Sequence, residues 1–182
     1  MKKRLQTQLC LTLLVIWQPL AGHCADVETR PELKRTSDLP NFHKVHSFLY
    51  RSGEPTAKGV QQCHDLGIKT LIDLRATGER TRREAAWGQE FGMKYINLPM
   101  SDKAPTKSQV DTFMETVRQA KKDNAPVLVH CAHGSDRTGC LVGIWRVSED
   151  GFTYDQAYKE MRRYYFGPQF KQLSGAVKAR AR

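Results

Sequence analysis

A single thiol in the segment VLVHCAHGSDRTG, residues 127–139, is surrounded by residues that could make it reactive. Cys131 follows a short apolar run, and glycines at 134 and 139 let the next residues turn tightly into a helix. A loop wound in this way points successive N–H groups into one hollow, and the helix start adds partial positive charge, so the hollow favours an oxyanion. We therefore expect phosphate to be bound by Ala132, His133, Gly134, Ser135, Asp136 and Arg137.

The arginine and the thiol together predict the reaction. The planar guanidinium of Arg137 can bind two phosphate oxygens at once. The same positive groups should lower the pKa of the Cys131 thiol below its free value of about 8.5. A thiolate beside a bound phosphate ester can attack the phosphorus and form a cysteinyl phosphate, which water then hydrolyses. Hydrogen bonds to the equatorial oxygens would be the largest catalytic contribution, and this chemistry requires no metal or other cofactor.

The residues beside the thiol and inside the loop have expected roles of their own. Thr138 follows the arginine, where its hydroxyl can donate to the sulfur and ease its departure in the second step. His130 precedes the cysteine, and we expect it to brace the loop through a backbone hydrogen bond. His133 and Asp136 are expected to face an approaching ligand, with Asp136 weakening the binding of a heavily charged one.

The elements that must position this loop follow from the hydrophobic pattern. Alternating strands and helices predict an α/β domain with a central, mainly parallel sheet flanked by helices. Such sheets bind ligands beyond the carboxyl ends of their strands, where the thiol loop begins. In the helix expected at 78–91, Ala85, Ala86 and Phe91 should face inward, and the terminal VKARAR should be frayed. Strands are predicted at 48–51, 68–74, 93–99 and 126–130, and helices at 56–66, 78–91, 106–122, from about 137, and at 153–166.

The start of the chain has the pattern of a secretory signal peptide. A basic head is followed by a short apolar run and then by small residues, which predicts a leader over residues 1–25. Residues 26–41 are polar, contain two prolines and show no periodicity, so we expect a flexible lead-in before a single folded domain at 42–182. The leader implies export, to the periplasm or outside the cell.

Charge indicates which partners to expect. The chain has 29 Lys and Arg against 19 Asp and Glu, a net charge of +10, of which three positive charges lie in the leader. This surplus favours phosphorylated proteins or small phosphate esters as substrates, and an anionic membrane surface is a further candidate partner. Nucleic acid is not expected, because no recognition motif with interleaved aromatic residues is present. A composition of 40% hydrophobic and 26% charged residues fits one globular domain, and we expect a monomer.

The cysteines do not form a disulfide framework. After the leader the chain has Cys63, Cys131 and Cys140, an odd number at irregular spacing. Cys63 could pair with Cys140, but two separate buried thiols are the preferred interpretation.

The sequence HCAHGSDRTG matches the H-C-x5-R-[ST]-G signature and therefore resembles the cysteine-dependent protein tyrosine and dual-specificity phosphatases. The resemblance extends over about residues 46–165, includes LYRSGEP and IDLR, and is strongest to small exported bacterial members. It implies the phosphatase-like α/β fold and a general acid, usually an aspartate on a loop upstream of the cysteine. Asp102, 29 residues before Cys131 in NLPMSDKAPT, fits that role. Asp73 is the other candidate for the general acid, but ion pairing with Arg75 and Glu79 explains that residue better.

Several functions remain open on these residues. The preferred one is a protein tyrosine or dual-specificity phosphatase that works through a cysteinyl-phosphate intermediate. The alternative is a phosphoinositide or inositol phosphate phosphatase that uses the same loop, to which Arg51 and Arg75 could add binding surface, although surface arginines are the usual explanation of both. A phosphate-binding module without turnover would not need the thiol, and a sulfur-transfer enzyme fits the Arg-Thr-Gly turn less well. Zinc binding by Cys131 with its neighbouring histidines is disfavoured, because adjacent residues cannot readily share one tetrahedral ion.

Overall fold

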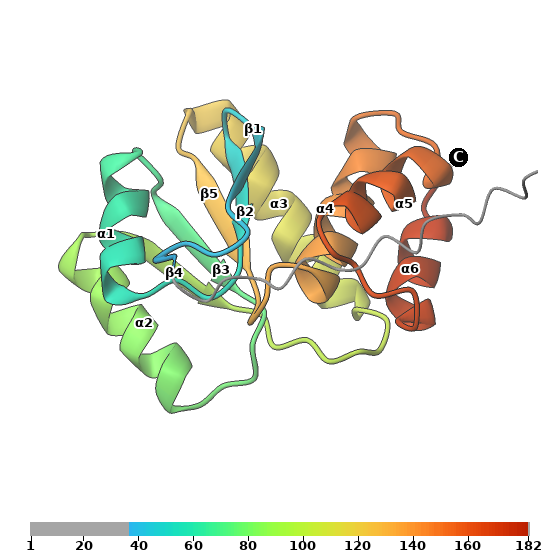
Figure 1. Ribbon diagram of the computed structural model, residues 1–182. Helices are drawn as coiled ribbons and strands as arrows, with labels where there is room; N and C mark the ends of the chain where they lie inside the picture. The colour runs from blue at the N-terminus through green and yellow to red at the C-terminus, as the bar shows by residue number, and fades with distance from the viewer. Residues whose placement is uncertain (1–36, 182) are drawn as a thin grey trace, which may run out of the picture. The chain divides into compact units, whose positions relative to one another are not determined.

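The computed structural model describes residues 37–181 (Figure 1). The predicted leader at 1–25 and residues 26–36 of the predicted lead-in lie outside the described residues. Within residues 37–181 no helix is both long and apolar enough to cross a membrane.

A five-stranded sheet forms the centre of the domain, in the order β1-β2-β5-β3-β4. The edge strand β1 runs antiparallel to β2, and the other neighbours run parallel, which confirms the predicted mainly parallel sheet. β1 was not expected, because its sequence HKVH is polar and it pairs on one side with β2. The strands are β1 (His43–His46), β2 (Leu49–Ser52), β3 (Thr70–Asp73), β4 (Lys94–Asn97) and β5 (Val127–His130).

Helices cover both faces of the sheet (Figure 1). Leu128 of β5 points into the cluster with α1 and α2, whereas its neighbours Val127 and Val129 point into the cluster with α3 to α6. This alternation explains why β5 is apolar throughout, since a parallel strand is buried on both faces. The helices are α1 (Ala57–Asp65), α2 (Glu79–Glu90), α3 (Lys107–Asp123), α4 (Asp136–Glu149), α5 (Tyr154–Arg163) and α6 (Lys171–Lys178).

Threonine caps explain where three of these helices begin. The hydroxyls of Thr56, Thr106 and Thr153 accept from the backbone amides three residues later, at the starts of α1, α3 and α5. In α3 and α5 a glutamine at that third position completes a capping box by returning a hydrogen bond to the cap. The predicted starts of these helices are confirmed.

Two predictions about helices were wrong in part. In α2 the buried residues are Thr81, Glu84 and Gly88, and Ala86 is exposed, whereas Phe91 packs against the core as predicted. Glu84 is buried because it pairs there with Arg75 and His130. The terminal VKARAR is not simply a frayed end, because α6 extends to Lys178 and Val177 is fully buried.

The folded domain begins before Phe42, so the predicted lead-in is too long. Leu39 is buried, and the Pro40 carbonyl accepts from the amide of Gly53 at 2.7 Å. Asp38 accepts from Thr56 through both its backbone and its side chain. Residues 38–41 therefore pack along the turn that follows β2.

Candidate active site

The thiol loop, residues 131–135, connects β5 to α4 at the carboxyl edge of the sheet. His130 ends β5 and lies opposite Ser52 of β2 and Asp73 of β3, so the loop begins where three parallel strands end. α4 starts at Asp136 and carries Leu141, Ile144 and Trp145 into the core, as predicted. The loop is thus held between a buried strand and a buried helix.

Each backbone carbonyl from residue 130 to residue 135 accepts a hydrogen bond from a group outside the hollow. Because the N–H and C=O of a peptide plane point in opposite directions, these bonds turn the loop amides toward the concave side. The result is a hollow lined by amides, and phosphate binding there by residues 132–137 stays a prediction. The six bonds are Leu74 N to His130 O, His130 Nδ1 to Cys131 O, Glu54 N to Ala132 O, Asn41 Nδ2 to His133 O, Arg51 Nη2 to Gly134 O and Gly139 N to Ser135 O.

Gly134 is required by the shape of the loop. Its φ of +72° lies in the left-handed region, and a Cβ at this position would lie 2.4 Å from the carbonyl carbon of Ser52. The backbone of the loop therefore passes directly over the end of β2, and a side chain at residue 134 would push the two apart.

The Cys131 thiol lies at the floor of the hollow, with 2% of the residue exposed. Burial by itself would raise the pKa of Cys131, but hydrogen bonding from Thr138, the charge of Arg137 and the amides of Thr138 and His133 lower it below its ordinary value. The thiols of Cys63 and Cys140 are also free, and burial raises the pKa of each to about 12. Cys131 is therefore the reactive thiol of the three, and the interpretation of Cys63 and Cys140 as separate thiols is confirmed.

Thr138 lies close to the thiol, and it contributes to the lowering of the Cys131 pKa. Its buried hydroxyl has no hydrogen-bond partner of regular geometry, the sulfur included, within residues 37–181. The role of Thr138 as a donor to the departing sulfur therefore stays a prediction.

Arg137 links the loop to the segment that carries Asp102. Its Nη1 donates to the carbonyl of Leu74 at 3.2 Å and to that of Met100 at 3.4 Å. Asp102 lies two residues beyond Met100 on the exposed stretch between β4 and α3. The structure thus brings the start of this stretch beside the guanidinium, and the role of Asp102 as general acid stays a prediction.

Arg51 is a fully buried residue behind the loop, and the expectation of a surface arginine was wrong. Its Nη2 donates to the Gly134 carbonyl at 2.6 Å, and its guanidinium lies 4.6 Å from the centre of the Tyr164 ring. Burial lowers the pKa of Arg51 to about 10, although Glu160 and Cys131 oppose that shift. Arg51 therefore supports the loop and is not part of an exposed binding surface.

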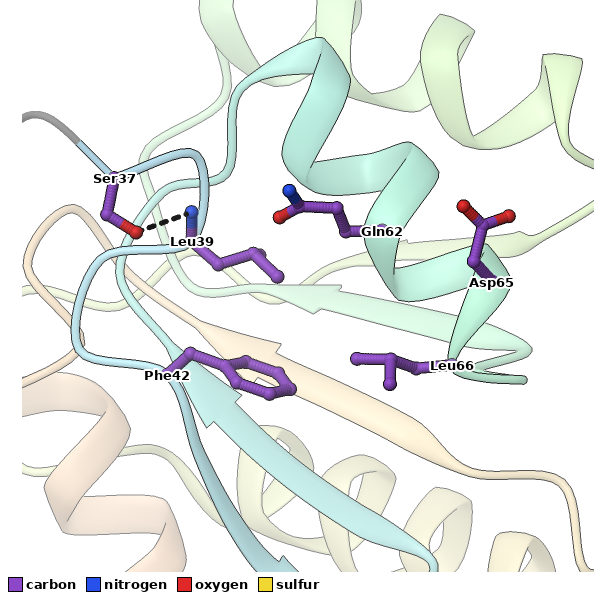
Figure 2. A pocket seen from close by; sticks show the side chains of 6 residues that line it. All are labelled: Ser37, Leu39, Phe42, Gln62, Asp65 and Leu66. Atoms are coloured by element: carbon purple, nitrogen blue, oxygen red, sulfur yellow. Dashed lines mark hydrogen bonds between the residues drawn. The ribbon is translucent and has the colours of Figure 1, made fainter.

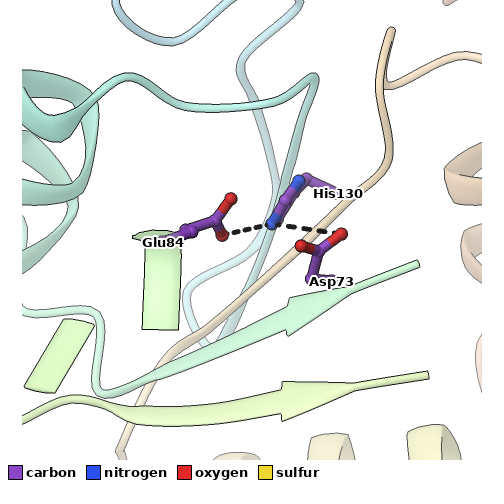
Figure 3. A group of neighbouring side chains, drawn as sticks. All are labelled: Asp73, Glu84 and His130. Carbon is purple, nitrogen blue, oxygen red and sulfur yellow. Dashed lines mark hydrogen bonds and ion pairs between the residues drawn. The ribbon is translucent and has the colours of Figure 1, made fainter. Parts of the chain in front are cut away.

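Arg75 is likewise buried and contacts a group of charged side chains. Figure 3 shows three members of this group, Asp73, Glu84 and His130. Arg75 donates to both oxygens of Asp73 and, at 2.5 Å, to Glu84, and it also pairs with Glu54. The predicted pairing of Asp73 with Arg75 is confirmed. The predicted partner Glu79 is wrong, because that residue is exposed and faces arginines of its own helix.

The same group contains a histidine and two carboxylates close enough to share a cation. Ligand atoms of Asp73, Glu84 and His130 lie within 4.8 Å of one another. Arg75 already donates to both carboxylates, and the Nε2 of His130 lies 2.6 Å from Glu84 Oε1. We therefore interpret these side chains as an ion-pair network.

His133 and Asp136 differ in how freely they face solvent. His133 is exposed at the rim of the loop, as expected. Asp136 is only partly exposed, and its Oδ1 accepts from the amide of Gly167 at 2.7 Å. One oxygen of the carboxylate thus ties the start of α4 to the segment between α5 and α6, and the expected repulsion toward highly charged ligands stays a prediction.

Sequence reasoning missed Asn41, Glu54 and Glu84. Asn41 and Glu54 lie in irregular segments, where no periodicity reveals a buried face. Glu84 could have been suspected from its spacing of three and four residues from Thr81 and Gly88, which places all three on one side of α2.

A separate hollow of about 520 Å³ lies away from the thiol loop, beside the carboxyl end of α1 (Figure 2). Leu39, Phe42 and the exposed Leu66 make it largely apolar. It has no residue in common with the site described above.

Comparison with known proteins relates the chain to phosphatases. The family model "DSP-PTPase phosphatase fused to NAD+ Kinase" matches residues 27–178. The dual specificity protein phosphatase TpbA of Pseudomonas aeruginosa is 28% identical over 127 residues, which is 70% of this chain and 56% of that protein. The inositol diphosphatase DSP5 of Arabidopsis thaliana is 32% identical over 114 residues, 59% of this chain and 53% of that protein. The chain thus spans little more than half the length of these relatives.

Solved structures show the same fold. The crystal structure of P. aeruginosa TpbA has a TM-score of 0.65 at 24% identity and covers 76% of this chain and 84% of its own. A second match is the core catalytic domain of the PP-IP phosphatase SIW14 from S. cerevisiae in complex with citrate. Its TM-score is 0.64 at 25% identity, and the match covers 74% of this chain and 83% of that one. The predicted phosphatase-like α/β fold is confirmed.

Proposed function

Because this chain belongs to the DSP-PTPase phosphatase family, with a family-model match over residues 27–178, we propose that it hydrolyses phosphate monoesters as a protein tyrosine or dual-specificity phosphatase. The observation that carries the proposal is the Cys131 thiol, whose pKa is lowered at the floor of a loop with every carbonyl turned outward. A thiolate and a ring of amides in one hollow suit displacement at phosphorus.

The reaction would proceed in two steps. In the first, Cys131 Sγ attacks phosphorus, the bond from phosphorus to the ester oxygen breaks, and Asp102 gives its proton to the departing oxygen. Arg137 and the loop amides hold the equatorial oxygens. In the second step water attacks phosphorus and gives its proton to the Asp102 carboxylate, inorganic phosphate forms, and the sulfur leaves as a thiolate stabilised by the Thr138 hydroxyl.

We propose phosphorylated proteins or small phosphate esters as substrates, phosphotyrosine among them. Support comes from TpbA, which is named a dual specificity protein phosphatase and whose Cys-to-Ser form was crystallised with phosphotyrosine. His133 at the rim is an exposed group that a substrate would meet first.

A second candidate is an inositol phosphate or phosphoinositide phosphatase. Two relatives carry such names, the inositol diphosphatase DSP5 and the PP-IP phosphatase SIW14. The net charge of +10 favours a ligand with several phosphates.

We also propose that the protein is exported to the periplasm or beyond and acts as a monomer. The basic, apolar and small-residue sequence of residues 1–25 supports export. Fractionation of cells that express the full chain with a C-terminal tag would test this, and a cytoplasmic protein of unchanged mass would contradict it.

A substrate panel with two variants tests the activity. Phosphopeptides, inositol phosphates, phosphoinositide vesicles and nucleotides are compared with wild-type protein, Cys131→Ser and Asp102→Asn. Cys131→Ser should bind phosphate without turning over any substrate, and retained turnover would refute the nucleophile. A preference for phosphopeptides by orders of magnitude would remove the inositol phosphate candidate.

A further inference from the structure

His130 is enclosed between two hydrogen-bond acceptors. Its Nε2 lies 2.6 Å from Oε1 of Glu84, and its Nδ1 lies 3.4 Å from the carbonyl oxygen of Cys131. The histidine is fully buried and Glu84 is 1% exposed, so water does not compete for either contact. Figure 3 shows the ring between the carboxylates of Glu84 and Asp73.

These acceptors determine the protonation of the ring. A carboxylate and a carbonyl oxygen both accept hydrogen bonds, and a neutral imidazole carries one N–H. Both contacts can be made together when both ring nitrogens are protonated, which makes His130 an imidazolium. The neighbours agree with this, because Glu84 and Asp73 raise the pKa of His130 although burial and Arg75 lower it.

The charges of the network balance with His130 in this form. The buried carboxylates of Asp73 and Glu84 face two cations, Arg75 and His130. Glu54, which also pairs with Arg75, has Arg80 as a second partner, so the wider group balances as well. The Tyr95 hydroxyl adds a neutral hydrogen bond to Asp73 at 2.7 Å. Without the charge of Glu84, the buried imidazolium would keep only the more distant Asp73, 4.0 Å from its Nε2 and already paired with Arg75.

We propose that Glu84 is a positioning residue for the thiol: it keeps His130 as an imidazolium, whose Nδ1–H holds the Cys131 carbonyl outward and whose charge favours the thiolate. Glu84 contacts neither substrate nor sulfur and acts through His130. The inference deepens the proposed function, since it concerns the nucleophile of that reaction, but its test requires no substrate.

The test measures the rate at which iodoacetamide alkylates Cys131 between pH 5 and 9, followed on the Cys131 peptide by mass spectrometry. Wild-type protein is compared with Glu84→Gln, which keeps the size of the side chain and removes its charge. Neutral His130 should raise the Cys131 pKa, because the Nδ1 side of the imidazolium faces Cys131 whereas the Glu84 charge that is lost with it lies beyond Nε2. Alkylation at pH 6 should therefore be about threefold or more slower in Glu84→Gln, which corresponds to a Cys131 pKa higher by about half a unit, with an unchanged rate at pH 9.

Glu79→Gln is the matched control. It removes the same charge from the same helix, but Glu79 is 69% exposed and does not touch His130. Its alkylation profile should coincide with that of wild-type protein. Glu84→Asp, which retains the charge, should restore most of the low-pH reactivity. A folded Glu84→Gln protein with the wild-type profile would overturn the proposal, since a merely structural role would change stability and leave the profile unchanged.

A second measurement uses wild-type protein and therefore does not depend on the folding of Glu84→Gln. The ¹⁵N resonances of His130 in wild-type protein should show both ring nitrogens protonated from pH 6 to pH 8. One unprotonated nitrogen at pH 7 would refute the proposal. Failure of the proposed function would be recognised separately, as wild-type protein that is alkylated in the expected way but turns over no substrate.

Discussion

Replacement of Gly134 by alanine tests whether the thiol loop depends on its close contact with β2. An alanine would have to hold the φ of +72°, which costs a residue with a Cβ about 1–2 kcal/mol. Its Cβ would also lie 2.4 Å from the Ser52 carbonyl carbon and 2.5 Å from the Gly53 nitrogen. These are backbone atoms that cannot rotate away, so overpacking should add about 1–3 kcal/mol. The expected loss in the free energy of unfolding is about 2–5 kcal/mol.

Gly151→Ala separates the two contributions. Gly151 has nearly the same φ, +70°, but nothing lies within 4 Å of the position that a Cβ would occupy. Gly151→Ala should therefore lose about 1–2 kcal/mol, from the backbone conformation alone. The difference between the two variants measures the contact of the loop with β2.

Urea unfolding and hydrolysis of an aryl phosphate provide the assays. Relief of the contact requires the loop to move by about an ångström, and a displacement of that size costs about 100-fold in rate. We expect kcat/KM to fall by about that factor in Gly134→Ala and to remain at the wild-type value in Gly151→Ala. Equal stability losses in the two variants, or an active Gly134→Ala protein, would refute the packing of the loop described here.

Three further predictions concern charges around the site. Arg51→Met should lower kcat/KM about tenfold or more, because it releases the Gly134 carbonyl. It should change the urea midpoint little, because two guanidinium nitrogens of Arg51 are buried without partners in residues 37–181. A large stability loss with intact activity would contradict this prediction. Asp102→Asn should lower kcat about 100-fold for alkyl phosphates and much less for p-nitrophenyl phosphate, because the p-nitrophenolate leaving group needs no general acid. An equal loss of kcat on the two kinds of substrate would argue against Asp102 as the general acid. The raised pKa of His130 contributes stability that is present below about pH 6.5 and is lost as the pH rises through the folded-state pKa. The urea midpoint of wild-type protein minus that of Glu84→Gln should therefore shrink from pH 6 to pH 9, and a constant difference would contradict this.

The sequence alone predicted the chemistry that we propose for the loop and determined the class of the fold. The spacing of Cys131, Arg137 and Thr138 identifies a phosphate loop, because local geometry from a strand end to a helix start depends on few residues, most of them adjacent. The alternation of apolar strands with amphipathic helices predicted the mainly parallel sheet and the inward face of α3, since each pattern reflects burial on one element at a time.

Tertiary structure decided what holds the loop in place. Asn41, Arg51 and Glu84 are far from Cys131 in the sequence, and each reaches the loop or its histidine only after the sheet brings separate segments to one edge. A buried charge is stable only beside its partners, so two arginines expected at the surface, and a glutamate for which no position was predicted, are buried where those partners meet. Periodicity measures hydrophobicity along one element, and for that reason it cannot reveal an ion pair that forms between elements.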